Sequence, residues 1–343
     1  MLLTTRRILP VLLASPFLSK QARAAERVTA RLDWSTWGVH APFHLALAKG
    51  WFERHGVAAQ FEDGNGSTAT VQIVGNGGFD IGHAALGPMI MARGRGVPVR
   101  ATAAFLRQND IGAMLPEGSG ITTIAALRGK KLAYTPGSLE APFIDRFLAA
   151  GGLKRDDLEL QSVDAAGKVG LYVNNRVDGM LSTIPFTLPS VRAQRPSIAI
   201  RFADHGLAFP SFGLFATERS IAQKPDALRR FSSVVAGTWS YILDGHEDEA
   251  VRAIIAARPQ ARLQPAVLRE QIELIRGYVT TEATKGQPIG PMAEADWAEA
   301  AANLATAGQI PKAEPAGAYF DATLLDTRII EDLAKGASGA APR

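Results

Sequence analysis

The segment from residue 28 to residue 56 constrains the fold of this chain more than any other. Its first part, VTARLDW, alternates apolar and polar residues, as a half-buried strand does. After the loop STWGVH, the apolar residues from Pro42 to Phe52 recur at helical spacing, and Gly56 is a natural helix end. The segment therefore predicts a strand, a loop and a helix, with the loop at the carboxyl end of the strand, where open α/β sheets bind ligands.

The same unit is predicted a second time further along the chain. The tripeptide APF at 41–43 recurs at 141–143, each time followed by a helical run that ends in glycine. Asp80 and Asp178 occupy matching turns, each between a helix and a short apolar strand, so we expect structural roles for both. Alternating strands and helices favour parallel sheets with right-handed crossovers. The chain is therefore predicted to be an α/β protein with two lobes, each a mostly parallel sheet flanked by helices.

The lobes are predicted to be unequal. From Pro225 onward the chain is mostly helical, with apolar residues spaced near 3.6, and these extra helices are expected to wrap the first lobe. The first lobe would comprise residues 27–110 and 212–335, and the second residues 111–211, with hinges near 108–111 and 209–213. The small, polar tail 336–343 is expected to be disordered.

Residues 1–24 predict a signal peptide that is cleaved on export. Arg6 and Arg7 precede a short apolar run, and Ala22-Arg23-Ala24 is a small-x-small cleavage site. The run is shorter than the roughly 20 residues that span a bilayer, which disfavours a membrane anchor. The TRRIL sequence also fits a twin-arginine signal in part, so the export route stays open. A periplasmic location is the expectation.

Charge and cysteine content exclude several classes of protein. The four basic residues of the leader account for the whole net charge of +4, so the rest of the chain has no basic excess for nucleic acid. The chain contains no cysteine, which excludes disulfides, thiolate metal ligands and a cysteine nucleophile. We predict no cofactor and no nucleic-acid partner.

The loop of the first unit offers aromatic and imidazole groups to a ligand. Trp34 and Trp37 give two flat faces for ring stacking, although core packing is a rival account for both. His40 and His44 stand four residues apart, which resembles half of a metal site. Because no Glu or thiol partner is nearby, we predict no metal, a ligand hydrogen bond for His40, and a structural role for His44.

Two glycine-containing loops, at residues 64–67 and 135–138, open predicted helices at the inferred cleft. Unpaired N–H groups at a helix start favour an oxyanion. Ser67 and Ser138 are alternatively simple helix caps, and Glu140 either contacts an amino group or only favours a helix start. The predicted ligand-binding set is Trp34, Trp37, His40, Asn65, Ser67, His83, Thr135, Gly137, Ser138, Glu140, Thr183 and Phe186.

Several motifs in order resemble the SsuA/THI5-like group of periplasmic solute-binding proteins, which serve ABC importers of sulfonates, nitrate, taurine and thiamin pyrimidine precursors. The motifs are LDWSTWGVHAPFHLALAKGWFERHGV, VGNGGFDIGHA, GRGVPV, GSGITTIAALRGKKLAYTPGS and NNRVDGML. The resemblance implies a type II binding-protein fold and a small aromatic, heteroaromatic or anionic solute. It also implies a membrane permease as partner, a monomer, and no enzymatic activity.

The chain departs from two enzymes of that group. Where a pyrimidine synthase carries its cofactor lysine and a sacrificial histidine, this sequence has Ala84 and Pro88, and LAFPSFGLF replaces a cysteine motif. A desulfinase of the group uses a cysteine nucleophile, which is also missing. An enzyme acting on a bound heterocycle or sulfinate remains the alternative, with His40, His83 and Glu140 as its candidate groups. A solute-sensing partner of a membrane receptor would share the same cleft.

Overall fold

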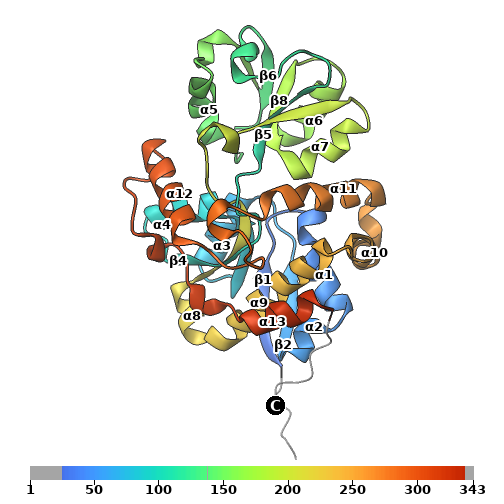
Figure 1. Cartoon of the computed structure of the whole chain (residues 1–343), viewed down its shortest axis with the longest axis vertical. Helices are drawn as coiled ribbons and strands as arrows, with labels where there is room; N and C mark the ends of the chain where they lie inside the picture. The colour runs from blue at the N-terminus through green and yellow to red at the C-terminus, as the bar shows by residue number, and fades with distance from the viewer. Residues whose placement is uncertain (1–24, 137, 337–343) are drawn as a thin grey trace, which may run out of the picture.

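The computed structural model describes residues 25–136 and 138–336. The predicted signal peptide, Gly137 and the tail from residue 337 lie outside these described residues. The chain forms two lobes stacked along the long axis of the molecule, each built around its own sheet (Figure 1). The helices that follow residue 225 surround the lobe that contains the N-terminal strand. The predicted two-lobe α/β fold is therefore confirmed.

The two sheets have the same strand order, so the repeat seen in the sequence is a repeat of topology. The first sheet runs β2-β1-β3-β10-β4 and the second runs β7-β6-β8-β5-β9. The strands are β1 (Glu26–Arg31), β2 (Val57–Glu62), β3 (Ile81–Ala85), β4 (Val99–Ala104), β5 (Ile111–Pro116), β6 (Lys131–Tyr134), β7 (Glu159–Ser162), β8 (Gly179–Thr183), β9 (Ser197–Arg201) and β10 (Phe212–Thr217).

Both sheets are mixed: in each, four of the five strands run in the same direction and one runs against them, which confirms the expectation of mostly parallel sheets. Strand β10 runs antiparallel to β3 and β4, and β5 runs antiparallel to β8 and β9. The β1–β2, β1–β3, β6–β7 and β6–β8 pairs are parallel. The reason is the path of the chain: β5 and β10 each enter from the other lobe, so no βαβ crossover within their own sheet fixes their direction.

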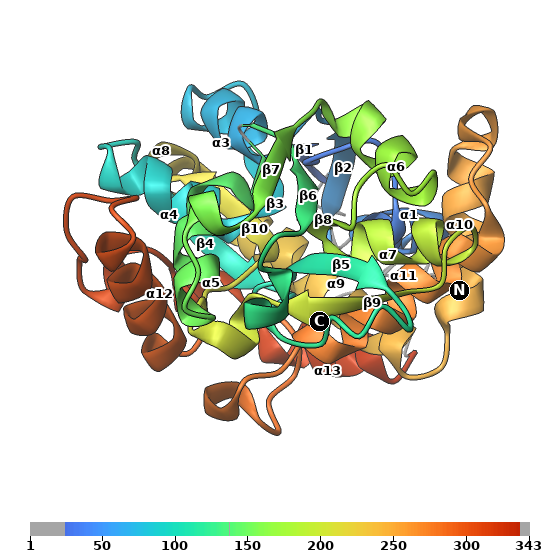
Figure 2. The same cartoon turned by 90° about the horizontal axis from the view of Figure 1, so that it is seen from above.

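Helices cover both sheets, and one of them reaches across to the other lobe. The first lobe has α1 (Ala41–Ala48), α2 (Trp51–Arg54), α3 (Ser67–Gly75) and α4 (Leu86–Gly94), and the second has α5 (Ile144–Ala150), α6 (Ala165–Val173) and α7 (Ile184–Arg192). The C-terminal helices are α8 (Glu218–Gln223), α9 (Pro225–Leu243), α10 (Glu247–Ala257), α11 (Pro265–Ile275), α12 (Glu294–Thr306) and α13 (Thr327–Ala334). Helix α11 packs against α7 beneath the second lobe (Figures 1 and 2).

The division of the chain at the residue numbers given above stays a prediction. Within the residues that the structure describes, no helix is both long enough and apolar enough to cross a bilayer. The sequence of segment 118–129, GSGITTIAALRG, predicts a capped helix. The structure has only the short 3-10 helix η2 (Ile124–Leu127) in this segment.

Each lobe has an aspartate at the equivalent position, Asp80 or Asp178, that joins two neighbouring strands. In the first lobe the Thr29 N–H donates to Asp80 Oδ2 at 2.9 Å, while the Asp80 N–H donates to the Thr29 carbonyl. In the second lobe Lys131 and Asp178 exchange the same two hydrogen bonds, at 2.8 Å each. Each carboxylate thus satisfies a backbone donor of the neighbouring strand, which is the structural role expected for both residues.

The two segments that connect the lobes are tied together by buried hydrogen bonds. The Ser211 N–H donates to the Leu106 carbonyl at 2.8 Å, and Ser211 Oγ donates to Asp110 Oδ1 at 2.5 Å. Asp110 Oδ2 is buried without a partner among the described residues. Burial raises the pKa of the Asp110 carboxyl to about 7, against the lowering effect of the Ser211 bond. A titrating carboxyl therefore lies at the crossing between the lobes.

We expect Asp110→Asn to stabilise the protein at high pH. A carboxyl whose pKa is higher in the folded state stabilises fully below its unfolded pKa, near 3.8, and this contribution is lost as the pH rises through about 7. Asparagine keeps the acceptor for Ser211 and never ionises. The variant should gain about 2 to 3 kcal/mol over the wild type between pH 5 and pH 8, measured by urea unfolding. An equal gain at both pH values would contradict this account.

Candidate functional site

A cavity of about 490 Å³ lies between the lobes and takes its walls from both of them. The first lobe contributes the loop after β1 and the N-terminal turn of α3, and the second contributes residues 135–140, helix α6 and the β8–α7 junction. Most of the exposed lining is apolar. The lining residues are Asp33, Trp34, Trp37, Asn65, Gly66, Ser67, Thr68, Ala69, Gln72, Thr135, Pro136, Ser138, Leu139, Glu140, Lys168, Ser182, Thr183, Phe186 and Phe212.

Aromatic side chains from both lobes meet in this cavity. The Trp37 ring contacts Phe186 of α7 edge to face, with centroids 5.2 Å apart, and Phe212 of β10 at 5.5 Å. Trp37 is almost fully buried, whereas Trp34 is half buried and keeps more of its surface open. Edge-to-face pairs add to the stability of aromatic contacts beyond their buried area. Trp37 therefore serves both the packing between the lobes and the wall of the cavity.

Behind these rings, two buried histidines converge on one oxygen of Asp33. His40 Nε2 lies 2.8 Å and His83 Nδ1 lies 3.1 Å from Asp33 Oδ1. Burial alone would raise the pKa of the Asp33 carboxyl, but the hydrogen bonds from the two rings outweigh it and hold that pKa well below its usual range. Asp33 is thus an ionised carboxylate in a dry wall.

Both imidazoles are best assigned as neutral donors. The Trp37 N–H donates to His40 Nδ1 at 3.3 Å, so this nitrogen carries no proton and His40 is the Nε2–H tautomer. Burial lowers the pKa of His83, and its Nε2 has no partner among the described residues, which disfavours a second proton there. The two rings donate to Asp33 without cancelling its charge.

The same ring geometry disfavours a metal ion, although the ligand atoms of Asp33, His40 and His83 lie within 4.8 Å of one another. A histidine that binds a metal almost always donates its other ring N–H to an acceptor. Here the other nitrogen of His40 faces a backbone donor, and that of His83 has no partner among the described residues. The expectation of no metal site stays a prediction, and the tautomers favour it.

On the opposite wall, a buried ion pair belongs to the second lobe. Lys168 Nζ on helix α6 lies 2.6 Å from Glu140 Oε1 and 2.7 Å from the Leu181 carbonyl oxygen. The side chains are 6% and 3% exposed, and both line the cavity. Buried charges in this geometry neutralise each other. Glu140 therefore already has a cationic partner inside the protein, whereas one of the two predictions from the sequence had it contact an amino group of the ligand.

A single side chain from the C-terminal helices links the lobes beside the cavity. The Gly38 N–H of the first lobe donates to Gln271 Oε1 at 2.8 Å, and Gln271 Nε2 donates to the Phe186 carbonyl of the second lobe at 2.9 Å. A methyl group on Gly38 would lie 2.7 Å from the Gln271 Cβ, so only glycine permits this approach. Helix α11 therefore fixes the spacing of the two walls.

The structure gathers most of the predicted ligand-binding residues around the cavity. Those in its wall are Trp34, Trp37, Asn65, Ser67, Thr135, Ser138, Glu140, Thr183 and Phe186. Two predicted contacts are corrected: His40 and His83 are fully buried behind Asp33, because their rings turn toward its carboxylate and away from the cavity. Gly137 lies outside the described residues. Ser67 also acts locally, since its Oγ accepts the Ala85 N–H at 3.1 Å.

Sequence reasoning missed the two most informative charges of the cavity. Asp33 stands directly before Trp34 at the end of the first strand, and that position is a usable signal for a ligand-facing residue. Lys168 is a lone charge among small and apolar residues of helix α6, which marks a buried or functional lysine. The pairing of Lys168 with Glu140, 28 residues away, had no signal in the sequence.

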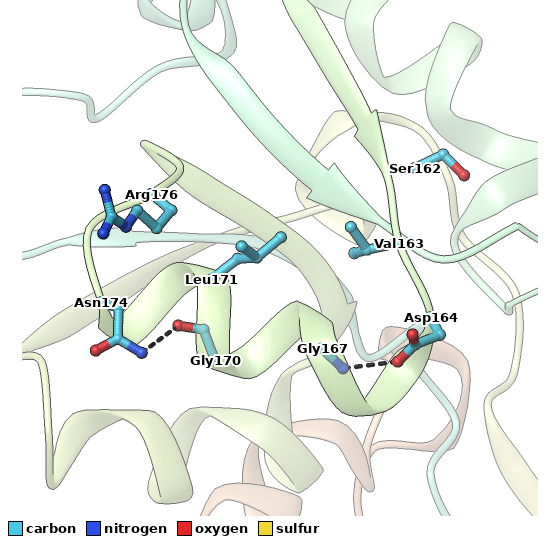
Figure 3. A pocket seen from close by; sticks show the side chains of 8 residues that line it. All are labelled: Ser162, Val163, Asp164, Gly167, Gly170, Leu171, Asn174 and Arg176. Carbon is cyan, nitrogen blue, oxygen red and sulfur yellow. Dashed lines mark hydrogen bonds between the residues drawn. The ribbon is translucent and has the colours of Figure 1, made fainter.

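A second hollow, of about 840 Å³, lies on the second lobe around helix α6 (Figure 3). It is open to solvent and is lined only by residues of that lobe, without an aromatic side chain. The hydrogen bonds drawn there are local: the Gly167 N–H donates to Asp164 and Asn174 donates to the Gly170 carbonyl. The cavity between the lobes is therefore the better candidate site.

Comparison with known proteins finds relatives of this chain in sequence and in fold. The family described as NMT1/THI5 like matches residues 37–250. The 4-amino-5-hydroxymethyl-2-methylpyrimidine phosphate synthase THI5 of Saccharomyces cerevisiae is 30% identical over 135 residues, which is 39% of this chain and 39% of that protein. The synthase of Aspergillus parasiticus is 29% identical over 233 residues, 64% of this chain and 68% of that protein. The chain thus matches well under half the length of the yeast relative.

The fold is that of a solved binding protein. The periplasmic aliphatic sulphonate binding protein SsuA from Escherichia coli superposes with a TM-score of 0.66 at 15% identity, covering 86% of this chain and 92% of that one. At this identity the likeness concerns the fold alone.

The expectation that the chain has no enzymatic activity is contradicted by its curated relatives. The curated relatives it matches are named as synthases, which are enzymes. The missing cysteines and the residues at 84 and 88 exclude only the chemistry of those particular groups. The Asp33 carboxylate and the ion pair of Lys168 with Glu140 inside one cavity leave other chemistry open.

Removing one partner of the buried ion pair should destabilise the second lobe. Lys168→Met leaves the Glu140 carboxylate buried without its counter-charge, and we expect a loss of about 3 to 5 kcal/mol in the free energy of unfolding. The double variant Lys168→Met/Glu140→Gln should recover most of this loss, because no buried charge remains. Urea denaturation of the single and double variants measures both. A single variant within 1 kcal/mol of the wild type would contradict a desolvated pair.

Proposed function

The chain belongs to the NMT1/THI5-like family, and from that premise we propose that it captures a small aromatic or heteroaromatic solute between its two lobes as the periplasmic binding component of an ABC importer. The observation that carries the proposal is the cavity of about 490 Å³ whose lining comes from both lobes. A solute there contacts both walls at once, so binding favours the closed arrangement that an importer recognises.

The chemistry of the lining supports an aromatic solute. The indole of Trp34 and the ring of Phe186 are half buried, so each presents surface to the cavity from a different lobe. Ring stacking in a mostly apolar pocket of this size is typical of small-molecule sites, which range from about 300 to 1,000 Å³. The hydroxyl groups of Ser138 and Thr183 would add polar contacts that orient a bound molecule.

Transport is the process into which such a binding step fits. The fold is shared with a protein described as periplasmic and sulphonate-binding, and the leader expected at residues 1–24 would deliver the chain to that compartment. Its partners would then be a membrane permease and the solute, with the protein acting as a monomer.

Conversion of a bound heterocycle is a second candidate function. It is favoured by the synthase names of the relatives and by the presence of Lys168 and Asp33 in one cavity. A binding component returns its ligand unaltered, whereas an enzyme does not. The same binding experiment separates the two if the recovered ligand is analysed.

The proposed function is tested with a thermal-shift panel of pyrimidines, sulfonates and aromatic acids on protein that lacks residues 1–24. A ligand that binds only the folded state at a hundredfold excess over its Kd stabilises by about 2.7 kcal/mol, which raises Tm. Mass spectrometry of the ligand after long incubation should return the original mass if capture is the function. A changed mass would favour the enzymatic candidate, and a panel without any shift would contradict both.

Trp34→Ala should weaken binding of an aromatic ligand from that panel without unfolding the protein. The half-buried indole offers a stacking face, and its loss should cost about 1 to 2 kcal/mol of binding free energy, or about five- to thirtyfold in Kd, by calorimetry. Phe79→Ala is the matched control, since Phe79 is also a half-buried ring of the first lobe but is not part of the lining. Equal effects of the two variants would contradict a stacking role for Trp34.

A further inference from the structure

We propose that the solute carries a positive charge or a row of polarised N–H groups, and that Asp33 is the residue that recognises this group. The inference rests on the proposed binding function and adds the charge of the ligand to it. It departs from an anionic ligand, which the glycine-containing loops of the sequence suggested.

Asp33 offers one free oxygen to the cavity. Both imidazole donors use Oδ1, at 2.8 and 3.1 Å, and neither uses Oδ2. About 7% of the Asp33 side chain remains exposed, and the residue is part of the cavity wall. A carboxylate held from behind by two rings has little freedom to rotate, so the free oxygen is already oriented for a donor.

The other ionisable groups around the cavity do not neutralise the negative charge of Asp33. His40 is neutral by its tautomer, and burial lowers the pKa of His83, so neither ring is a counter-ion. Lys168 is held at 2.6 Å by Glu140, and this pair sums to no net charge. Among the described side chains that line or back the cavity, one uncompensated negative charge therefore remains.

The N-terminus of helix α3 also borders the cavity, through Gly66, Ser67 and Thr68. A helix N-terminus is equivalent to roughly half a positive charge, which is less than the full charge of the carboxylate. An acceptor group of the ligand fits at that end, but the balance of the cavity stays negative. The faces of Trp34 and Trp37 favour the same sign, because aromatic faces attract cations.

The test uses three flat probes of nearly equal shape: benzamidinium, benzamide and benzoate. They differ in charge from positive through neutral to negative, so shape and stacking are held constant. We expect the wild type to bind benzamidinium at least about tenfold more tightly than the other two, because a charge-assisted hydrogen bond is about twice as strong as a neutral one. Ligand-observed NMR measures the three dissociation constants even if binding is weak.

Asp33→Asn changes one atom and should invert the preference. The two imidazole donors hold the amide oxygen at the Oδ1 position, so the NH₂ group faces the cavity in place of an acceptor. Benzamidinium should lose about tenfold or more in affinity, and benzoate should gain. Asp226→Asn removes the same charge at an exposed site on α9, outside the lining, and should leave all three constants within about twofold.

If the Asp33→Asn variant does not fold, the three dissociation constants of the wild type still test the inference. Because the hydrogen bonds from His40 and His83 keep the pKa of the Asp33 carboxyl low, this carboxylate is ionised when the three probes are compared on the wild type at pH 7. Benzoate or benzamide binding as tightly as benzamidinium, or no binding of any probe at millimolar concentration, would overturn the inference. The proposed function fails if neither the thermal-shift panel nor the three probes give a ligand, whereas a panel ligand without any preference for benzamidinium overturns the inference alone.

Discussion

The carboxylate of Asp33, held on one oxygen by two buried imidazoles, is the interaction on which the site depends. Removing an ionised carboxylate from water costs several kcal/mol unless hydrogen bonds replace its hydration. His40 and His83 supply those bonds from the loop after β1 and from β3, so the three residues join two parts of the first lobe. The cluster is a structural element of the lobe and at the same time the polar part of the cavity wall.

The second lobe also buries a carboxylate, but it stabilises this charge with a cation and not with neutral donors. Its buried charge, Glu140, is neutralised within the same lobe by Lys168, whereas Asp33 has only neutral donors. The two lobes share a strand order and the aspartate that joins neighbouring strands, yet their cavity walls are electrostatically unequal. A repeated scaffold therefore does not lead to a symmetric site, because the charged residues at the cavity differ between the lobes although the strand-joining aspartates do not.

Contacts across the lobes set how far apart these walls lie. Trp37 meets Phe186 edge to face, and Gln271 hydrogen-bonds one lobe through Gly38 and the other through the Phe186 carbonyl. Ser211 and Asp110 tie the two connecting segments together on the path between the sheets. Movement of the lobes would have to break or rearrange these contacts, together with the packing of α11 against α7 and the ion pair between Arg192 and Glu270.

Much of this protein was determined by its sequence alone: the doubled strand-loop-helix unit, the two-lobe α/β fold, and the placement of Trp34, Asn65, Thr135 and Phe186 at a shared cleft. These features follow from local periodicity and from the rule that ligands bind at the carboxyl ends of strands. Tertiary structure decided the rest. The antiparallel direction of β5 and β10, the pairing of Lys168 with Glu140, and the burial of His40 and His83 behind Asp33 depend on contacts between residues distant in the chain, for which no local pattern exists.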